Sequence, residues 1–137
     1  MEQDLENAGW RPETDDGFVG HVGGLWRRDI NGRMQMAFIA RPFHANRNGV
    51  VHGGMLMTFV DRAFGQFARV TTGATRGATI SLNHNFLAPV RIGDLVEIEP
   101  EIVKVTTRLV FVAGTAHVAD ASVISAQGIF RVSHSPR

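Results

Sequence analysis

One segment of this chain has the periodicity of a buried helix, and strand-like segments lie on both sides of it. From Gly53 to about residue 70, apolar residues recur every three to four positions, and Thr71, Thr72 and Gly73 end the pattern. The strand-like segments are residues 25–30, 34–40, 79–87, 95–105, 108–118 and 122–132. Because the connections between them are short, neighbouring strands are expected to be antiparallel. The order predicts an α+β fold, in which one antiparallel sheet of five or six strands wraps around one long central helix.

Length and composition limit the class of protein. The 137 residues suit one domain, with residues 1–20 as a polar N-terminal arm and residues 133–137 as a flexible tail. The net charge of +1, from 14 basic and 13 acidic side chains, does not favour nucleic acid as a partner. The absence of cysteine excludes a disulfide, a thiolate metal site and a cysteine nucleophile. Because we find neither a membrane-spanning apolar run nor a signal-peptide core, we expect a cytoplasmic protein with no membrane partner.

A two-residue turn separates the first pair of predicted strands. Asn31-Gly32 is the strongest short-range signal for a β-hairpin, because both residues readily adopt positive φ. The segments on either side of it are therefore expected to pair with each other.

The start of the predicted helix could bind a developing negative charge. Gly53 and Gly54 open the helix, and the first amides of a helix have no partner within it. A backbone without side chains can approach a ligand closely, and the helix N-terminus favours negative charge. These glycines are therefore either an oxyanion-binding site or simply a tight turn from loop to helix.

Asp61 is the only acidic residue of the predicted helix. The residues one turn away from it include no cation that would form an ion pair. A carboxylate among small and apolar side chains is a candidate general base or nucleophile. The alternative is a solvated carboxylate at the margin of the polar stripe that contains Arg62 and Arg69.

The segment that follows the helix alternates strictly between two kinds of residue. Thr79, Ser81, Asn83 and Asn85 are expected on one face of a strand, and Ile80, Leu82, His84 and Phe86 on the other. The polar face suits hydrogen bonding to a catalytic carboxylate, contact with another subunit, or plain exposure. His84 is expected to be a core histidine. No metal-binding or serine-hydrolase pattern is present, so neither site is predicted.

Two blocks of the sequence resemble the hotdog-fold acyl-CoA thioesterases, specifically their phenylacetic-acid-degradation (PaaI-like) branch. The first block is N-x-x-G-x-x-H-G-G-x(6)-D, and the second is TISLNHNFLAPVRIGD. The residues of the first block are Asn46, Gly49, His52, Gly53, Gly54 and Asp61. The resemblance implies a six-stranded sheet around the helix, and hydrolysis of an acyl-CoA thioester to a carboxylic acid and free coenzyme A.

The resemblance also implies a role for each catalytic residue. The amide of Gly53 would polarise the thioester carbonyl, and Asp61 would be the nucleophile or the base that activates water. Asn46 would position water or substrate, His52 would help to hold the thioester end, and Thr79 would support the Asp61 carboxylate.

Further residues are expected to contact the substrate. These are Gly54, Met57, Phe64, Asn83 and Phe86. No metal and no separate cofactor is expected, since coenzyme A is part of the substrate. Its phosphates need cations, for which the equal candidates are Arg41, Arg47, Arg91, Arg108 and Arg131.

We expect a homodimer, assembled further into a dimer of dimers, as the resemblance implies and as an edge strand with unpaired amides permits. Gly53 and Asp61 are eight residues apart, which separates them by about 12 Å along a helix. One straight helix cannot bring both to one thioester. We therefore expect two-fold-related helices to share each site.

Two other functions stay open at this point. A hotdog-type hydratase or dehydratase needs an acid and a base across a Cα–Cβ bond, and His52 and Asp61 are candidates. A non-catalytic acyl-CoA-binding module is the second alternative. The glycine pair after His52 favours hydrolysis over hydration, and 137 residues leave little room for the output domain of a sensor.

Overall fold

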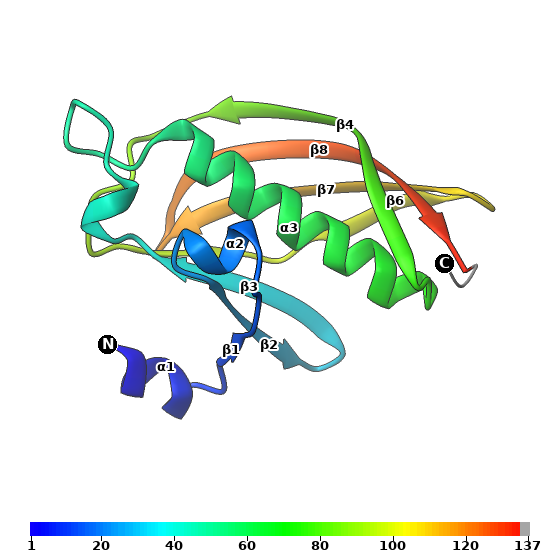
Figure 1. Cartoon of the computed structure of the whole chain (residues 1–137), viewed down its shortest axis with the longest axis horizontal. Coiled ribbons are helices and arrows are strands. Elements are labelled where there is room, and N and C mark those ends of the chain that lie inside the picture. The colour runs from blue at the N-terminus through cyan, green and yellow to red at the C-terminus, as the bar shows by residue number, and fades with distance from the viewer. Residues whose placement is uncertain (135–137) are drawn as a thin grey trace.

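A curved antiparallel sheet wraps around one long helix (Figure 1). The structure is a computed structural model that describes residues 1–134. Within these residues the sheet has eight strands in the order β1-β2-β3-β5-β7-β8-β4, with β6 paired to β7. The strands are β1 (Arg11–Glu13), β2 (Leu25–Ile30), β3 (Arg33–Ile39), β4 (Arg76–Phe86), β5 (Leu95–Ile98), β6 (Glu101–Val105), β7 (Leu109–Val118) and β8 (Ala121–Ser133). The helices are α1 (Glu2–Asn7), α2 (Phe18–His21), the short 3₁₀ helix η1 (Pro42–His44) and α3 (Gly53–Thr72).

The central helix α3 buries its apolar side against the sheet. Phe59 packs on Phe38 of β3 with ring centroids 4.9 Å apart, and Phe64 packs on Phe130 of β8 at 6.4 Å. Gly73 ends the helix in the left-handed conformation, with φ of 72°. The α+β architecture and the central helix predicted from periodicity are confirmed.

The sheet has more strands than the five or six that the sequence predicts. β1 lies within the N-terminal arm and pairs with β2, although three residues are too few to give an alternation signal. The segment expected as one strand, 95–105, is two strands, β5 and β6. Pro100 lies between them, and proline has no N–H to continue a ladder of hydrogen bonds.

The hairpin between β2 and β3 has the predicted turn. Asn31 and Gly32 have φ of 53° and 76°, as a two-residue turn of type I′ requires. Ile30 pairs with Arg33 directly beside the turn. A local sequence signal was sufficient here, because the turn depends on only two residues.

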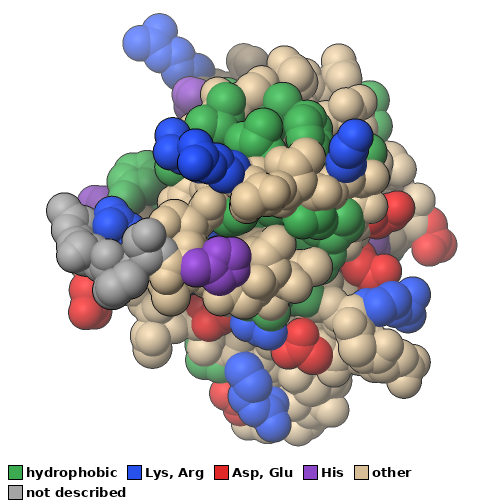
Figure 2. All heavy atoms as spheres, turned by 90° about the vertical axis from the view of Figure 1, so that its right-hand side faces the viewer, with side chains coloured by type: hydrophobic (Ala, Val, Ile, Leu, Met, Phe, Trp, Pro, Cys, Tyr) green, Lys and Arg blue, Asp and Glu red, His purple; other side chains and the backbone are tan. Residues whose placement is uncertain are grey.

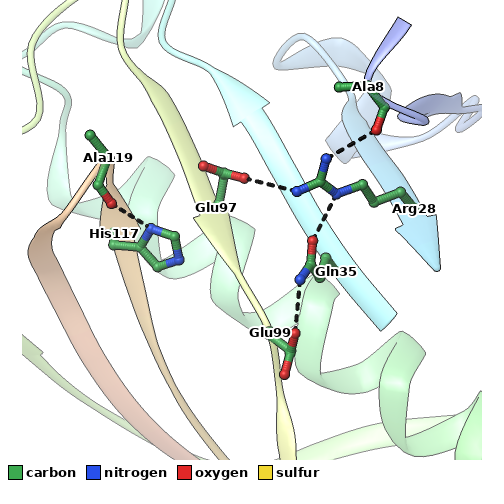
Figure 3. Close-up of polar contacts among 7 residues, drawn as sticks. All are labelled: Ala8, Arg28, Gln35, Glu97, Glu99, His117 and Ala119. Carbon is green, nitrogen blue, oxygen red and sulfur yellow. Dashed lines mark hydrogen bonds and ion pairs between the residues drawn. The ribbon is translucent and has the colours of Figure 1, made fainter. Parts of the chain in front are cut away.

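The first part of the N-terminal arm, up to Trp10, covers the outer face of the sheet, opposite α3. Trp10 is almost fully buried there, and the Arg28 guanidinium lies 4.3 Å from its ring centroid. Arg28 also donates to the carbonyl of Ala8 at 3.0 Å and to Gln35 of β3 at 2.7 Å, and it pairs with Glu97 of β5 at 3.7 Å (Figure 3). One arginine therefore ties the arm to three strands.

A bulge in β4 changes which residues share a face. Thr79 pairs with Phe130 and Ser81 pairs with Ile129, so Ile80 is an extra residue without a partner in β8. Phe130 is buried on the α3 side, and paired residues point to the same side of a sheet. Thr79 therefore lies on the α3 side, whereas Ser81 lies on the outer side. The predicted single face for both residues is wrong.

The surface mixes basic, acidic and apolar side chains, in agreement with the near-neutral net charge. Figure 2 shows this at the end of the molecule nearest the C-terminus, where hydrophobic side chains lie among charges of both signs. Within residues 1–134, no helix is both long and apolar enough to span a membrane. Of the predicted flexible tail, Ser133 ends β8 and His134 contacts the Thr72 carbonyl at 3.1 Å, while residues 135–137 lie outside the described chain.

Candidate active site

The carboxylate of Asp61 is held by a hydroxyl of the neighbouring edge strand. Thr79 of β4 donates its Oγ1–H to Asp61 Oδ1 over 2.6 Å. Within the described chain, Asp61 takes part in no ion pair. A hydrogen bond to one oxygen orients the carboxylate and leaves the other oxygen for a ligand or a water molecule. The β4 bulge is what puts Thr79 on the side from which it can make this bond.

The N-terminus of α3 presents an amide without an internal partner. His52 caps the helix, and its Nδ1 accepts the N–H of Gly54 over 2.8 Å. Among residues 1–134, the N–H of Gly53 has no acceptor. A Cβ at position 53 would lie 3.2 Å from Cζ of Phe86, so glycine lets this ring pack directly on the start of the helix. A free amide beside an apolar ring can bind the oxygen of a polarised carbonyl.

The loop before α3 is organised by Asn46. Its Oδ1 accepts the N–H of Asn48 at 2.8 Å and that of Val50 at 3.3 Å. Gly49, with φ of 79°, completes the reversal. The side-chain NH₂ of Asn46 has no acceptor in the described part of the chain, and Asn46 and His52 line the same surface hollow. That NH₂ can therefore donate to a ligand.

The predicted catalytic residues fall into two groups. Asn46, His52 and Gly53 lie at the start of α3, whereas Asp61 and Thr79 meet two turns further along. The eight residues between Gly53 and Asp61 correspond to about 12 Å along the helix axis. The hollows lined by Asn46, by Gly53 and by Asp61 are separate. A single chain therefore does not bring the two groups to one point.

The residues predicted to contact substrate also divide. Gly54 is exposed at the start of α3, and Met57 and Phe86 are 42% and 53% exposed. Phe64 is fully buried against Phe130 in the core. Asn83 pairs with Gln127 and lines a hollow on the outer face, with the sheet between it and α3. Neither residue lines the hollows of Gly53 or Asp61 in the single chain, so their contact with substrate stays a prediction.

His84 lies on the α3 side of β4 and is partly buried. Its ring stacks on that of Phe86, with centroids 6.3 Å apart and planes 13° from parallel. Its Nε2 is buried without a hydrogen-bond partner among the described residues. Burial lowers the pKa of His84 below its usual 6.5, while the negative charge of Asp61 opposes that shift. The imidazole is therefore neutral at pH 7, and it is not the fully satisfied core histidine that we expected.

Comparison with known proteins identifies the family. The pattern described as the thioesterase superfamily matches residues 48–125, more than half of the chain. The chain belongs to the thioesterase superfamily.

Curated relatives agree with this assignment. PA0474 of Pseudomonas aeruginosa, which carries the provisional name of an esterase, is 27% identical over 107 residues, covering 77% of this chain and 80% of its own length. The mouse protein named acyl-coenzyme A thioesterase 13 is 29% identical over 68 residues, covering 50% of this chain and 49% of its own length. Membership makes the chain an enzyme of the thioester hydrolase class.

Solved structures agree on the hotdog fold. A Streptococcus pneumoniae protein described as a thioesterase, solved with coenzyme A, superposes with a TM-score of 0.74 at 18% identity, covering 93% of this chain and 99% of its own. BH2602 of Bacillus halodurans, also solved with coenzyme A, gives a TM-score of 0.71 at 24% identity, covering 80% and 74%. The predicted hotdog fold is confirmed.

The thioesterase chain has a polar groove that sequence reasoning missed. It runs between α3 and β4 past the Asp61–Thr79 pair, and Gly65 and Arg69 of α3 and Gly77 of β4 line its further part. Gly65 is the residue that could have indicated this groove. Glycine in the middle of a helix lowers helix stability by about 1 kcal/mol relative to alanine, so its presence often has a packing or binding reason.

The five arginines considered for the coenzyme A phosphates are no longer equal. Arg41 pairs with Glu2 at 3.0 Å. Arg47 lines the hollow of Asn46 and His52, and the backbone of Arg91 bridges to Val50 in the same loop. Arg108 and Arg131 line a separate hollow with Ile80. Within residues 1–134, no group of His, Asp and Glu is arranged to hold a metal ion.

Proposed function

We propose that this protein is an acyl-CoA thioesterase that converts an acyl-CoA to a carboxylic acid and free coenzyme A. The observation that carries the proposal is the Asp61 carboxylate oriented by Thr79 at 2.6 Å, on a chain of the thioesterase superfamily. The mouse relative named for acyl-CoA hydrolysis supports this substrate class. So do two structural neighbours that were solved with coenzyme A.

In the proposed reaction, the N–H of Gly53 polarises the thioester carbonyl by donating to its oxygen. Asp61 either attacks the carbonyl carbon itself, forming a mixed anhydride that water then hydrolyses, or removes a proton from the water that attacks it. The C–S bond breaks when the tetrahedral intermediate collapses, and the coenzyme A thiolate takes a proton from water or from the protonated Asp61 and leaves as the thiol. Thr79 donates to Asp61, and Asn46 and His52 hold the opposite side of the site. No metal or separate cofactor takes part in this scheme.

We infer that the active unit is a homodimer, and that dimers pair into a tetramer. The edge strand β4 and the residue that follows it expose three apolar side chains: Ile80, Phe86 and Leu87 are 58%, 53% and 53% exposed. A two-fold axis beside β4 would extend the sheet and bury these side chains. It would also bring Asp61 of one chain opposite Gly53 of the other, which the 12 Å separation of about eight helical residues requires. We also propose that the chain belongs to the PaaI-like branch and that the protein is cytoplasmic.

Thiol release from a panel of aryl, arylacetyl, short-chain and long-chain acyl-CoAs tests the proposed function. We expect turnover of at least one class, and we expect Asp61→Asn to reduce it by two or more orders of magnitude, as for loss of a general base or nucleophile. Asp29→Asn is the matched control, since Asp29 pairs with Arg27 on β2. Binding of acyl-CoA without any thiol release would support the binding module instead.

A further inference from the structure

The groove beyond Asp61 ends in a cation that has no acidic partner. Arg69 lines this groove together with Asp61, Gly65 and Gly77. Its side chain lies along β4, with Cγ only 3.2 Å from where a Cβ of Gly77 would stand. Among residues 1–134 no carboxylate pairs with Arg69. A positive charge therefore stands at the far end of the groove that holds the proposed catalytic carboxylate.

The other polar groups of the groove are already engaged by the N-terminal arm. Arg62 pairs with Asp15 at 3.0 Å, and Gln66 donates to Glu13 at 2.6 Å. The amide of Gly17 and the charge of Arg62 together lower the pKa of Asp15, although partial burial opposes them. The arm thus supplies an acid to Arg62 and leaves Arg69 without one. The two cations differ in this respect although they lie on one face of the same helix.

Two glycines keep the space between Asp61 and Arg69 open. A Cβ at Gly65 would stand 3.5 Å from the Phe130 ring, which forms the floor at that point. A Cβ at Gly77 would press on the stem of Arg69. Asp61 and Arg69 are eight residues apart on α3, about 12 Å along its axis. This spacing leaves room for a substrate segment of several bonds between a thioester at Asp61 and the guanidinium.

We propose that Arg69 binds an anionic group of the substrate within the α3–β4 groove. The proposal rests on the proposed function, because Asp61 marks where the thioester lies. A guanidinium recognises a carboxylate or a phosphate with paired N–H donors. The anion is either a carboxylate at the end of the acyl group or a phosphate of coenzyme A. An arginine in the last turn of a helix also stabilises the helix dipole, and a purely structural role of that kind would not change ligand binding.

Non-hydrolysable thioethers separate these sources by calorimetry. S-(5-carboxypentyl)-CoA and S-hexyl-CoA differ in the terminal carboxylate, and S-hexyl-pantetheine lacks the nucleotide phosphates. The Kd of each is measured for the wild type, Arg69→Gln, Arg69→Lys and Arg33→Gln. The last is the control, because Arg33 lies in the β2–β3 hairpin and pairs with Glu99.

We expect Arg69→Gln to raise the Kd of at least one coenzyme A ligand about tenfold, the loss typical of one hydrogen bond to a charged group. A loss of affinity confined to the carboxypentyl ligand assigns the anion to the acyl group. Equal loss for both CoA ligands, absent with the pantetheine, assigns it to a phosphate. Arg69→Lys should recover part of the affinity, and Arg33→Gln should change nothing.

Affinities that stay within twofold in Arg69→Gln for every ligand overturn the assignment of Arg69. Thiol release from hexanoyl-CoA by the wild type tests the proposed function separately. A wild type that binds and hydrolyses, but is indifferent to Arg69→Gln, overturns only this inference. A wild type that binds none of the three thioethers and releases thiol from no acyl-CoA of the panel overturns both.

Discussion

The contact between Thr79 and Asp61 depends on a hydroxyl that points toward α3. Thr79→Val keeps the β-branched shape and removes the donor to Asp61 Oδ1. We expect kcat to fall about tenfold, because the carboxylate loses one charge-assisted hydrogen bond in a partly exposed site. Thr79→Ser retains the hydroxyl and should stay within threefold of the wild type. Steady-state kinetics on the best substrate checks both, and equal kcat values for Val and Ser would remove Thr79 from the mechanism.

A second residue-scale prediction concerns His84 and acid stability. Because its pKa is lower in the folded chain than the usual 6.5, the unfolded chain takes up a proton first as the pH falls. The contribution of neutral His84 is therefore complete above about pH 6.5 and is lost as the pH falls below that value. His84→Leu should lose less stability than the wild type between pH 7.5 and pH 5.5, within the window that follows from this lowered pKa.

Urea unfolding midpoints at the two pH values measure this difference. His117→Gln is the control, since the His117 ring hydrogen-bonds the carbonyl of Ala119 in its own turn (Figure 3). If His84→Leu and the wild type lose the same stability between the two pH values, the burial of this ring does not contribute to the pH dependence of unfolding.

Among the elements, the β2–β3 hairpin offers the cleanest test of backbone conformation. Gly32 has φ of 76°, and a Cβ there would meet no atom within 4 Å. Gly32→Ala therefore adds no steric clash with the rest of the molecule, and only the left-handed conformation is penalised, by about 1–2 kcal/mol. A urea titration should show a lower midpoint with an unchanged slope. Gly32→Asn is the comparison, since asparagine tolerates the left-handed conformation that alanine does not.

The elements that sequence predicted are those whose signal is local. The period of α3 and the Asn31-Gly32 turn depend on neighbours in the chain, and both are confirmed. Strand β1 and the β4 bulge were missed because they depend on what lies across the sheet. The same limit applies to the candidate site. The motif from Asn46 to Asp61 is continuous in sequence, so the sequence alone predicts it. The proposed role of Arg69 depends on its packing against Gly77, a residue on another element, which the sequence does not reveal.

For the whole molecule, the separation of the two catalytic groups predicts complementation between inactive variants. Asn46→Ala damages the loop side of the site and Asp61→Asn damages the carboxylate side. If two chains build each site, a heterodimer has one site with both defects and one intact site. Random pairing makes about half of the dimers mixed, so roughly a quarter of wild-type activity should return on co-refolding.

The control for this experiment is each variant refolded alone, assayed for thiol release at the same total concentration. Native mass spectrometry of differently tagged chains confirms that mixed dimers form. Mixed dimers with no more activity than the two parents would show that each chain carries a complete site.

The bulge in β4 also bears on how this chain tolerates changes of length. Thr79 and Ser81 already face opposite sides of the sheet, as adjacent residues of a regular strand would. Deleting Ile80, which is 58% exposed and has no partner in β8, would leave Thr79 opposite Phe130 and Ser81 opposite Ile129. A deletion inside a strand normally reverses every side chain beyond it. At this position the strand can shorten by one residue without reversing the side chains beyond it, and the change would remove only one apolar side chain from the proposed dimer edge.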